Sequence, residues 1–437
     1  MFYPLSQSLN ISMKLALLAG TQSGCGKTTI MLALLQYLKV QQQSVTSFKA
    51  GPDFLDPLWH QLLTGRTSYN LDTRMVGIEQ SRQQINKQHQ HVELALIEGV
   101  MGLFDGRSGV GLDGSSADLA KGLACPIILV VNAKGMSGSI VPLVSGYCDF
   151  AEKMGVNISG IIANQVGSAH HASLLKNFLV DYDMPPLLAW MEKDVPALPE
   201  RHLGLVTPDE TDAPDFSKFF HVDHTALLNA FAEWTDNKQD VDKVERRLLG
   251  KKIAIAKDAA CCFIYPANID CLTEQGAEIS YFSVIAGESV PLDADAVWLP
   301  GGYPELYAEQ LSLSKSWDSL NQFIQAGHPV LAECGGSVLL GTELIDIKGV
   351  AWPMSGLLPY QSKMQKRLAS LGYREDVSGI RGHEFHYSVR DNEKDFQSCF
   401  ECSRGDKGIR YKNLRTSYIH WYFPSAPEVM AAWLVKN

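Results

Sequence analysis

The sequence lacks the features that mark nucleic-acid-binding, membrane-spanning and disulfide-stabilised proteins. No block of Lys and Arg occurs in a chain whose net charge is −10, and a phosphate-backbone partner requires a basic surface, so no nucleic-acid partner is expected. The longest apolar runs, such as PIILVV, suit buried strands and are too short to span a membrane. The nine cysteines are odd in number and scattered, which indicates reduced thiols. The N-terminal MFYPLSQSLNISMK has no charged n-region followed by a long apolar core, so we expect a cytoplasmic protein.

Length and pattern predict two domains of the α/β class. A chain of 437 residues exceeds the size at which one hydrophobic core keeps growing. Apolar strand-like runs alternate with helical patterns through residues 1–206, which predicts a doubly wound parallel sheet. Residues 207–250 are polar and charged and are expected to form a linker region. A second alternation over residues 251–437 predicts another open α/β sheet.

The stretch GTQSGCGKTT, residues 20–29, has the composition and context of a phosphate-binding loop. It follows an apolar strand and opens an apolar-periodic helix. Glycines allow successive N–H groups to converge on phosphate oxygens, and the helix N-terminus adds positive potential. Lys27 is expected to reach the outer phosphates, and Thr28 to hold Mg²⁺. The predicted ATP-binding residues are Gly20, Thr21, Gly24, Gly26, Lys27, Thr28 and Thr29.

Two acidic stretches, KAGPDFLDPLWH and LIEGVMGLFDG, follow the next predicted strands. Mg²⁺ binds few protein carboxylates and keeps water and phosphate as its other ligands. We therefore expect Asp53 and Glu98, at the carboxyl ends of strands, to complete a metal site with Thr28. Asp56 and Asp105 lie further along the same loops and are expected beside the substrate. The alternative for each carboxylate is a solvated loop residue or a helix cap.

The stretch PVLAECGGSVLLG, residues 329–341, places a thiol between a predicted strand and a predicted helix. Such a turn exposes the side chain of Cys334, and the N–H of Gly335 with the helix dipole is expected to favour a thiolate and an oxyanion. The turn in WLPGGYPE ends another strand, so the N–H of Gly302 or of its neighbour is the candidate for the second oxyanion donor.

A thiol nucleophile also needs a base, and three histidines follow Cys334 in the sequence. His420 in TSYIHWYF is the candidate base because it lies near a strand-like run at the chain end. His383 and His386 in RGHEFHYS are expected to be structural or substrate-facing. A structural role for His420 is the alternative.

The two ends of the chain resemble known families. The phosphate loop has five residues between Gly20 and the GK pair, a spacing similar to that of dethiobiotin synthetase and the partition-type ATPases. The Cys and His pattern resembles a class I glutamine amidotransferase, although Tyr422 stands where such enzymes usually carry Glu. That departure is similar to the glutaminase branch of the cobyrinic and cobyric acid synthases.

Eight motifs in order resemble the cobyrinate a,c-diamide synthase family over nearly the whole chain. The family often has a second His at the position of Tyr422 and an Asp at that of Asn132. The motifs are GTQSGCGKTT, KAGPDFLDP, IEGVMGLFDG, GSSADLAK, GIIANQVGS, LPGGYPE, AECGG and GHEFHYS.

The resemblance implies a glutamine-dependent ligase of cobalamin biosynthesis. ATP with Mg²⁺ would phosphorylate the a and c side-chain carboxylates of cobyrinate, and ammonia that Cys334 releases from L-glutamine would displace phosphate from each acyl phosphate. The two sites are expected to face one another with water excluded. Hydrogenobyrinate and nickel-sirohydrochlorin are alternative ring substrates, and a partition-type ATPase switch is the alternative from another class. Assembly into a homodimer stays open.

Overall fold

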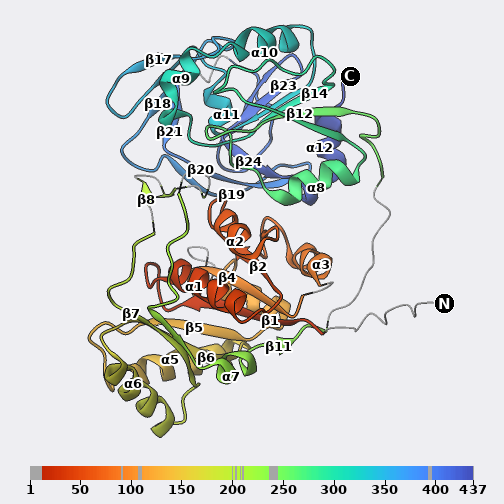
Figure 1. Cartoon of the computed structure of the whole chain (residues 1–437). Coiled ribbons are helices and arrows are strands. Elements are labelled where there is room, and N and C mark those ends of the chain that lie inside the picture. The colour runs from red at the N-terminus through yellow and green to blue at the C-terminus, as the bar shows by residue number, and fades with distance from the viewer. Residues whose placement is uncertain are drawn as a thin grey trace, which may run out of the picture. The chain divides into compact units, whose positions relative to one another are not determined.

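The computed structural model describes residues 12–89, 92–106, 111–198, 200–201, 204–206, 208, 211–235, 245–391 and 396–436. The chain divides into two compact units, Met1–Asp240 and Val241–Asn437 (Figure 1). Each unit contains its own β-sheet and its own hydrophobic core. The α/β class expected from the sequence is confirmed for both units.

The first unit is built on a nine-stranded sheet with the order β10-β7-β6-β5-β1-β4-β2-β3, and β11 pairs with β1. Strands β1 to β7 run parallel, while β10 and β11 are antiparallel to their neighbours. The strands are β1 (Lys14–Gly20), β2 (Val45–Ala50), β3 (Tyr69–Leu71), β4 (Leu94–Gly102), β5 (Ile127–Asn132), β6 (Ile158–Val166), β7 (Leu187–Glu192), β10 (Phe220–Val222) and β11 (Ala232–Glu233). A separate hairpin pairs β8 (Glu200–Arg201) with β9 (Gly204–Leu205).

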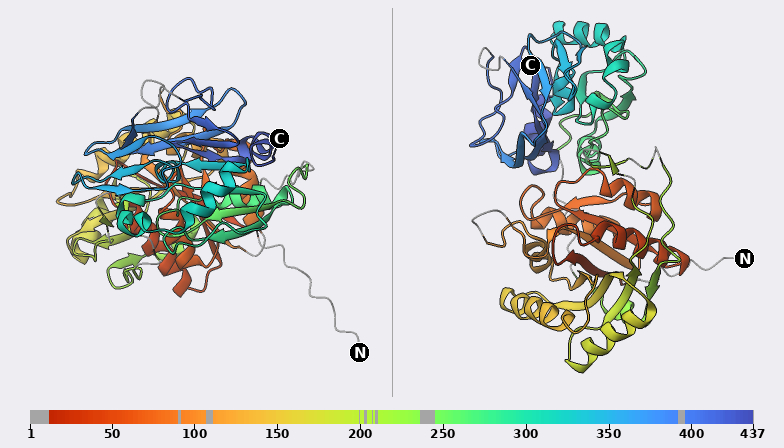
Figure 2. Two further views of the ribbon diagram at one scale, coloured as in Figure 1. Left: turned by 90° about the horizontal axis from the view of Figure 1, so that it is seen from above. Right: turned by 90° about the vertical axis from the view of Figure 1, so that its left-hand side faces the viewer.

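Helices cover both faces of this sheet (Figure 2). Leu18 of β1 belongs to a core that includes the apolar face of α1, while its neighbour Leu17 points to the other face and is also fully buried. Burial on both faces explains why the strands read as continuous apolar runs. The helices are α1 (Lys27–Val40), α2 (Asp56–Thr64), α3 (Ile78–Gln88), α4 (Ser116–Leu123), α5 (Ile140–Met154), α6 (Ala169–Asp181) and α7 (His224–Asn229).

The direction of winding changes at β1, whose two neighbours in the sheet are β4 and β5. In an open α/β sheet, ligands bind beyond the carboxyl ends of the strands at such a switch point. The phosphate loop follows β1 directly, so the topology places it in the position that a ligand site requires.

Within residues 207–250, which the sequence predicts as a linker region, the described part contributes three elements to the first unit. β10 pairs with β7, β11 pairs with β1, and α7 lies between them along the chain. Phe216, Phe220 and Leu227 are buried in the same core as α1. These isolated apolar residues anchor the segment although its average composition is polar.

The second unit is built on a six-stranded sheet with the order β13-β12-β14-β15-β23-β22. All neighbours are parallel except β22, which is antiparallel to β23. Its strands are β12 (Lys252–Ala256), β13 (Glu278–Phe282), β14 (Ala296–Leu299), β15 (Val330–Glu333), β22 (Ile409–Tyr411) and β23 (Leu414–Ser417). Its helices are α8 (Pro266–Glu274), α9 (Ala308–Ser312), α10 (Ser316–Gln325), α11 (Gly335–Val338) and α12 (Pro427–Trp433), with 3₁₀ turns η1 (Pro304–Leu306) and η3 (Phe423–Ser425).

Two small sheets complete the second unit. One has the order β17-β16-β18-β21 and the other the order β19-β20-β24. The second of these carries all three candidate histidines, because β20 contains the GHEFH motif and β24 contains IHWY. The strands are β16 (Glu343–Ile345), β17 (Ala351–Pro353), β18 (Gln361–Met364), β19 (Ser370–Glu375), β20 (Arg381–His386), β21 (Ser388–Arg390) and β24 (Ile419–Tyr422).

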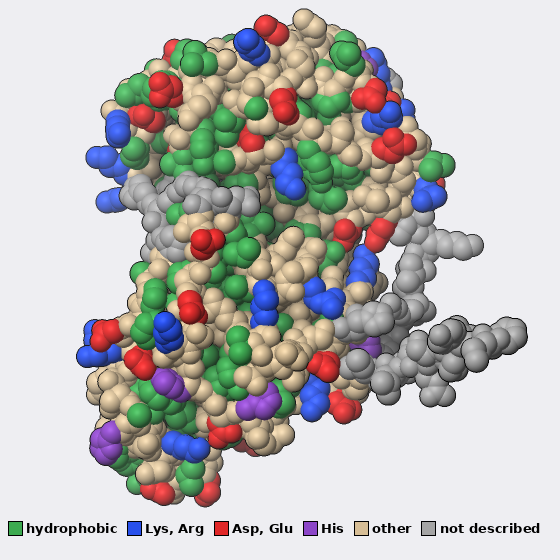
Figure 3. All heavy atoms as spheres, in the orientation of Figure 1, with side chains coloured by type: hydrophobic (Ala, Val, Ile, Leu, Met, Phe, Trp, Pro, Cys, Tyr) green, Lys and Arg blue, Asp and Glu red, His purple; other side chains and the backbone are tan. Residues whose placement is uncertain are grey.

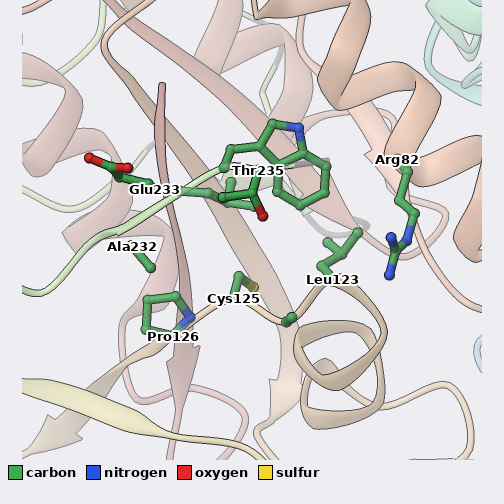
Figure 4. A pocket seen from close by; sticks show the side chains of 10 residues that line it. Arg82, Leu123, Cys125, Pro126, Ala232, Glu233 and Thr235 are labelled. Atoms are coloured by element: carbon green, nitrogen blue, oxygen red, sulfur yellow. The ribbon is translucent and has the colours of Figure 1, made fainter. Parts of the chain in front are cut away.

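Acidic and basic side chains are interspersed on the face of the molecule shown in Figure 3. A small pocket lies near the start of β1, at the opposite end of that strand from the phosphate loop (Figure 4). Leu15, Arg82, Cys125 and Trp234 are among its lining residues, and its volume is about 90 Å³. This volume is well below the several hundred Å³ of typical ligand pockets. We therefore do not assign the pocket to a substrate.

Candidate active sites

The phosphate loop owes its shape to glycines and to a contact with β6. Gly24 and Gly26 have φ values of 76° and 93°, in the left-handed region that favours glycine. Space also excludes a side chain at Gly26, because a Cβ there would lie 2.1 Å from Asn164 Nδ2. The same amide donates a hydrogen bond of 2.9 Å to the carbonyl oxygen of Cys25. The conformation of the loop is thus tied to the strand beside it.

Lys27 and Thr28 form the first turn of α1 and point toward the end of β4. The ammonium of Lys27 donates to the carbonyl oxygen of Met101, and burial lowers the pKa of this lysine. Thr28 Oγ1 donates to Glu98 Oε1 at 2.7 Å. The structure therefore brings Thr28 together with one of the two carboxylates that the sequence predicted.

Glu98 lies within β4, although the sequence analysis placed it at a strand end. β4 continues to Gly102, and Glu98 is opposite Leu18 of β1 and Lys49 of β2 in the sheet. Its side chain is fully buried and accepts hydrogen bonds at both oxygens. Burial alone would raise the pKa of Glu98, but Lys49 and His60 outweigh burial and lower it to about 2. The carboxylate is therefore ionised at neutral pH.

Lys49 is the cationic centre of this buried cluster. Its Nζ lies 2.5 Å from Asp56 Oδ2 and 3.1 Å from Glu98 Oε1. Burial would lower the pKa of Lys49, but these two carboxylates raise it well above the usual range. Asp53 adds to the negative charge near Lys49. Asp56 and Glu98 thus share one lysine beside the phosphate loop, and burial raises the pKa of Asp56 well above its usual range.

The other predicted carboxylates have local partners. Asp53 Oδ1 accepts hydrogen bonds from the backbone N–H groups of Leu55 and Asp56, at 2.8 and 3.1 Å. Asp56, expected beside the substrate, is buried and forms the first residue of α2 with its ion pair to Lys49. Asp105 is exposed, and its Oδ2 accepts from the N–H of Gly102 at 2.8 Å.

Sequence reasoning missed Lys49 and His60. Lys49 occurs in a strand whose six residues are all buried, and a fully buried lysine is almost always paired. A lysine inside an apolar strand was therefore the sequence feature that could have indicated a buried ion pair. His60 follows Asp56 by four residues, so both side chains project from the same face of α2.

Cys334 occupies a strained turn between β15 and α11. Its φ of 46° and ψ of −108° are unusual for a residue with a side chain. Two glycines follow because a neighbouring strand end leaves no room. A Cβ at Gly336 would lie 2.2 Å from the carbonyl oxygen of Leu299, and one at Gly335 would lie 2.9 Å from the backbone nitrogen of Gly302. The structure therefore brings together Gly335 and Gly302, the two predicted oxyanion donors.

His420 lies beside Cys334 on the other side of Gly301. A Cβ at Gly301 would lie 2.2 Å from His420 Cε1 and 3.2 Å from Cys334 Cβ. Only glycine leaves space for both groups at this point. The two residues predicted as nucleophile and base thus meet, although 86 positions separate Cys334 from His420 in the sequence.

The thiol of Cys334 is buried, and this burial changes the pKa values that the sequence suggested for the site. Only 7% of Cys334 is exposed, and burial, followed by the nearby carboxylate of Glu305, raises the pKa of the thiol. The N–H of Gly335 lowers this pKa but does not compensate, since α11 is only four residues long. Burial and the neighbouring His383 lower the pKa of His420 to about 3. The expectation of an exposed thiolate was therefore wrong for this structure, in which both groups are neutral.

Glu333, the residue before the thiol, holds β24 against β15. It accepts hydrogen bonds from Trp421 N at 3.0 Å and from Trp298 Nε1 at 3.1 Å, and burial raises its pKa to about 8. Because Trp421 follows His420 directly, this contact fixes the backbone that carries the imidazole. Sequence reasoning did not select Glu333.

The remaining histidines are both buried. His383 is the cross-strand partner of His420 between β20 and β24, and burial lowers the pKa of His383 to about 4. His386 hydrogen-bonds to Glu384 Oε1 at 2.9 Å and to the carbonyl oxygen of Ser388 at 2.7 Å. Tyr422 is fully buried and packs edge-on against the ring of Tyr265.

Three further findings concern metal ligands, membrane-spanning helices and cysteines. Within the described part of the chain, no three His, Cys, Asp or Glu side chains are grouped so that they could hold a metal ion by themselves. None of the helices that the structure describes is both long enough and apolar enough to cross a membrane. The nine cysteines all lie in described segments and are free thiols.

The fold defines a protein that combines a nucleotide-binding domain with a glutamine amidotransferase domain. Residues 16–206 match the CobQ/CobB/MinD/ParA nucleotide binding domain. Residues 252–428 match the CobB/CobQ-like glutamine amidotransferase domain.

Full-length relatives make the identification more specific. The chain is 38% identical to cobyrinate a,c-diamide synthase of Herminiimonas arsenicoxydans, with 96% of each chain covered. It is 35% identical to the cobyrinate a,c-diamide synthase of Priestia megaterium, with 95% of each covered. It is 36% identical to hydrogenobyrinate a,c-diamide synthase of Pseudomonas aeruginosa, with 96% of each covered. The chain belongs to the cobyrinate a,c-diamide synthase family, as the motifs predicted.

Proposed function

We propose that this protein catalyses the ATP-dependent amidation of the a and c side-chain carboxylates of cobyrinate with ammonia from L-glutamine. The observation that carries the proposal is the presence, in one chain of this family, of a phosphate loop beside a charged cluster and of a buried Cys334–His420 pair. The first site suits phosphoryl transfer, and the second suits attack on an amide.

In the first unit, Lys27 and the loop N–H groups would bind the phosphates of ATP. Transfer of the γ-phosphoryl group to a ring carboxylate forms an acyl phosphate and ADP. Ammonia then attacks the acyl carbon, and inorganic phosphate leaves as the amide forms. Lys49 would stabilise the negative charge that develops on the transferred group, because its ammonium lies at the centre of the buried cluster.

The donor set fits Mg²⁺. Thr28 Oγ1 and Glu98 Oε1 lie 2.7 Å apart, and the low pKa of Glu98, about 2, keeps this carboxylate ionised. Mg²⁺ is usually held by one or two carboxylates with phosphate and water, so a full protein ligand set is not required. Thr28 and Glu98, with Asp53 nearby, would hold the ion. When bound, it would neutralise charge on the phosphates of ATP.

In the second unit, the Sγ of Cys334 would attack the side-chain amide carbon of glutamine. His420 would accept the thiol proton and pass it to the departing nitrogen, so that ammonia leaves and a thioester forms. Water then hydrolyses the thioester to glutamate. The N–H groups of Gly302 and Gly335 would stabilise the tetrahedral oxyanion, a role that the closeness of the two glycines supports. Because the pair is neutral before substrate binds, proton transfer and attack would occur together.

The test is an assay of the purified protein with ATP, glutamine and one tetrapyrrole at a time, with the product identified by mass. We expect a diamide from cobyrinate. Hydrogenobyrinate is the second candidate substrate, since some relatives are named for that ring, and nickel-sirohydrochlorin is the third arm. ATP hydrolysis without amidation of any ring would contradict the proposal.

A further inference from the structure

His60 is a fully buried histidine in the first unit that the proposed mechanism does not use. It lies on α2, which packs beside β2 (Figure 1). Its Nε2 lies 2.9 Å from Glu98 Oε2, and its Nδ1 lies 3.1 Å from Ser68 Oγ. All three side chains are buried, and the imidazole links a carboxylate on β4 to a hydroxyl before β3.

Each of the two carboxylate oxygens of Glu98 has its own contacts. Oε1 accepts from Thr28 Oγ1 at 2.7 Å and lies 3.1 Å from Lys49 Nζ. Oε2 is the atom that faces His60. Because a carboxylate only accepts, His60 must donate from Nε2, and the Ser68 hydroxyl, which can donate or accept, pairs with Nδ1. Ser68 thereby fixes the orientation of the imidazole ring that donates to Glu98.

The terminal torsion of a glutamate side chain is soft, so burial alone does not orient its carboxylate. Without a donor at Oε2, the group would rotate to find a partner for that buried oxygen, and Oε1 would leave its position beside Thr28. Side chains that orient a metal-binding carboxylate commonly act in this way.

We propose that Ser68 and His60 form a positioning pair that holds Glu98 with Oε1 directed to the metal–nucleotide site. Helix α2 supplies the second constraint on the cluster, since Asp56, four residues before His60, holds Lys49. One face of α2 therefore positions two side chains of the buried cluster: His60 positions Glu98, and Asp56 positions Lys49. The inference rests on the proposed role of Glu98 toward the ion, and it requires no assumption about the ring substrate.

The test compares two amide replacements in the full-length chain. In His60→Gln the amide nitrogen can reach the place of Nε2 and still donate to Glu98. In His60→Asn the shorter side chain reaches only the place of Nδ1. The affinity for Mn²⁺ is measured at saturating ATP from the electron paramagnetic resonance signal of the free ion. Nucleotide affinity in EDTA and the melting temperature are measured alongside.

We expect His60→Asn to bind Mn²⁺ about 10- to 100-fold more weakly, the range found for such outer partners. His60→Gln should recover most of the affinity, and nucleotide binding in EDTA should be equal in all three proteins. A purely structural role would lower the melting temperature of both variants without separating their Mn²⁺ affinities. Wild-type Mn²⁺ affinity in His60→Asn, or equal losses in the two variants, would overturn the proposal.

Ser68→Ala provides a second route if the His60 variants do not fold. It keeps the imidazole and removes only the hydroxyl that orients the ring, so a smaller loss of Mn²⁺ affinity is expected. Unchanged affinity in Ser68→Ala would also contradict the positioning pair. Because the assay contains neither glutamine nor a tetrapyrrole, a failure to amidate cobyrinate would leave this test intact.

Discussion

The two sites of this protein differ in whether their buried side chains carry charge. In the first site Lys49 and Glu98 are buried as ions, because their mutual attraction outweighs the cost of burial. At Cys334 and His420 the second site is just as dry, but burial dominates and keeps thiol and imidazole neutral. A site that binds the polyphosphate of ATP together with a metal ion is helped by charged side chains that are already in place before ATP binds. A site that attacks a neutral amide needs a transferable proton.

The largest effect should follow from removing a charged group of the first site. Lys27→Ala and Glu98→Gln should each reduce amidation by ~10³-fold or more, with glutamine and with ammonium alike, because neither nitrogen source can displace a phosphate that was never transferred. Diamide formation is followed by mass. Lys176→Ala, at an exposed lysine on α6, is the control. Normal diamide production by Lys27→Ala at ordinary ATP concentrations would disprove the phosphoryl-transfer half of the proposal.

Removing the thiol should affect only one nitrogen source. Cys334→Ala should lose glutamine-dependent amidation to background and retain synthesis from high ammonium, because the thiol serves the release of ammonia and has no role in forming the acyl phosphate. Rates with the two nitrogen sources are measured in parallel. Cys271→Ala, at another buried cysteine of the same unit, controls for packing. Loss of the ammonium-dependent rate in a folded Cys334→Ala protein would show that the two sites do not divide the reaction in this way.

A smaller effect is expected from the base. His420→Asn should slow glutamine hydrolysis by ~10²-fold, a typical contribution of general-base catalysis, and leave nucleotide affinity unchanged. His383→Asn and His386→Asn are matched comparisons, since both residues lie on the neighbouring strand. If either comparison variant carried the larger loss of glutaminase rate, the assignment of the base to His420 would be incorrect.

The smallest effect concerns acid stability. The pKa of Glu98 is about 2 in the folded protein against 4.5 for an ordinary glutamate. The unfolded chain therefore binds more protons than the folded chain between these values. Stability from Glu98 is complete above pH 4.5 and is lost as the pH falls toward 2. Glu98→Gln should lessen this loss by at most about 1.4 kcal/mol per pH unit.

The free energy of unfolding in urea, measured from pH 5 to pH 3, checks this expectation. Glu245→Gln replaces an exposed glutamate and should follow the wild type. Glu384 of the second unit also has a pKa of about 2, so the wild-type slope contains contributions from both units. Identical slopes in Glu98→Gln and wild type would mean that the buried cluster does not hold Glu98 ionised.

The sequence alone was sufficient for the fold class, the family and the two strand-to-helix turns. Each of these depends on local pattern: apolar runs of strand length, glycines where only left-handed backbone fits, and a lysine or a cysteine at a fixed offset from them. Gly26 and Gly335 are examples. The motifs contain glycine at both positions, and the structure shows that a Cβ at either one would collide with neighbouring atoms. The boundary of the first unit was less predictable, because β10 and β11 are three and two residues long.

Tertiary structure decided the environment of these residues. Pattern alone could not place His60 against Glu98, because hydrogen bonds between α2 and β4 depend on how the helix packs on the sheet. It could not predict that Cys334 would be buried, because the strand end of β14, the Gly301–Gly302 turn and β24 enclose the thiol from segments far apart in the sequence. The type of chemistry follows from residue identity and local spacing. Charge state and orientation follow from burial and long-range partners, and these exist only in the folded chain.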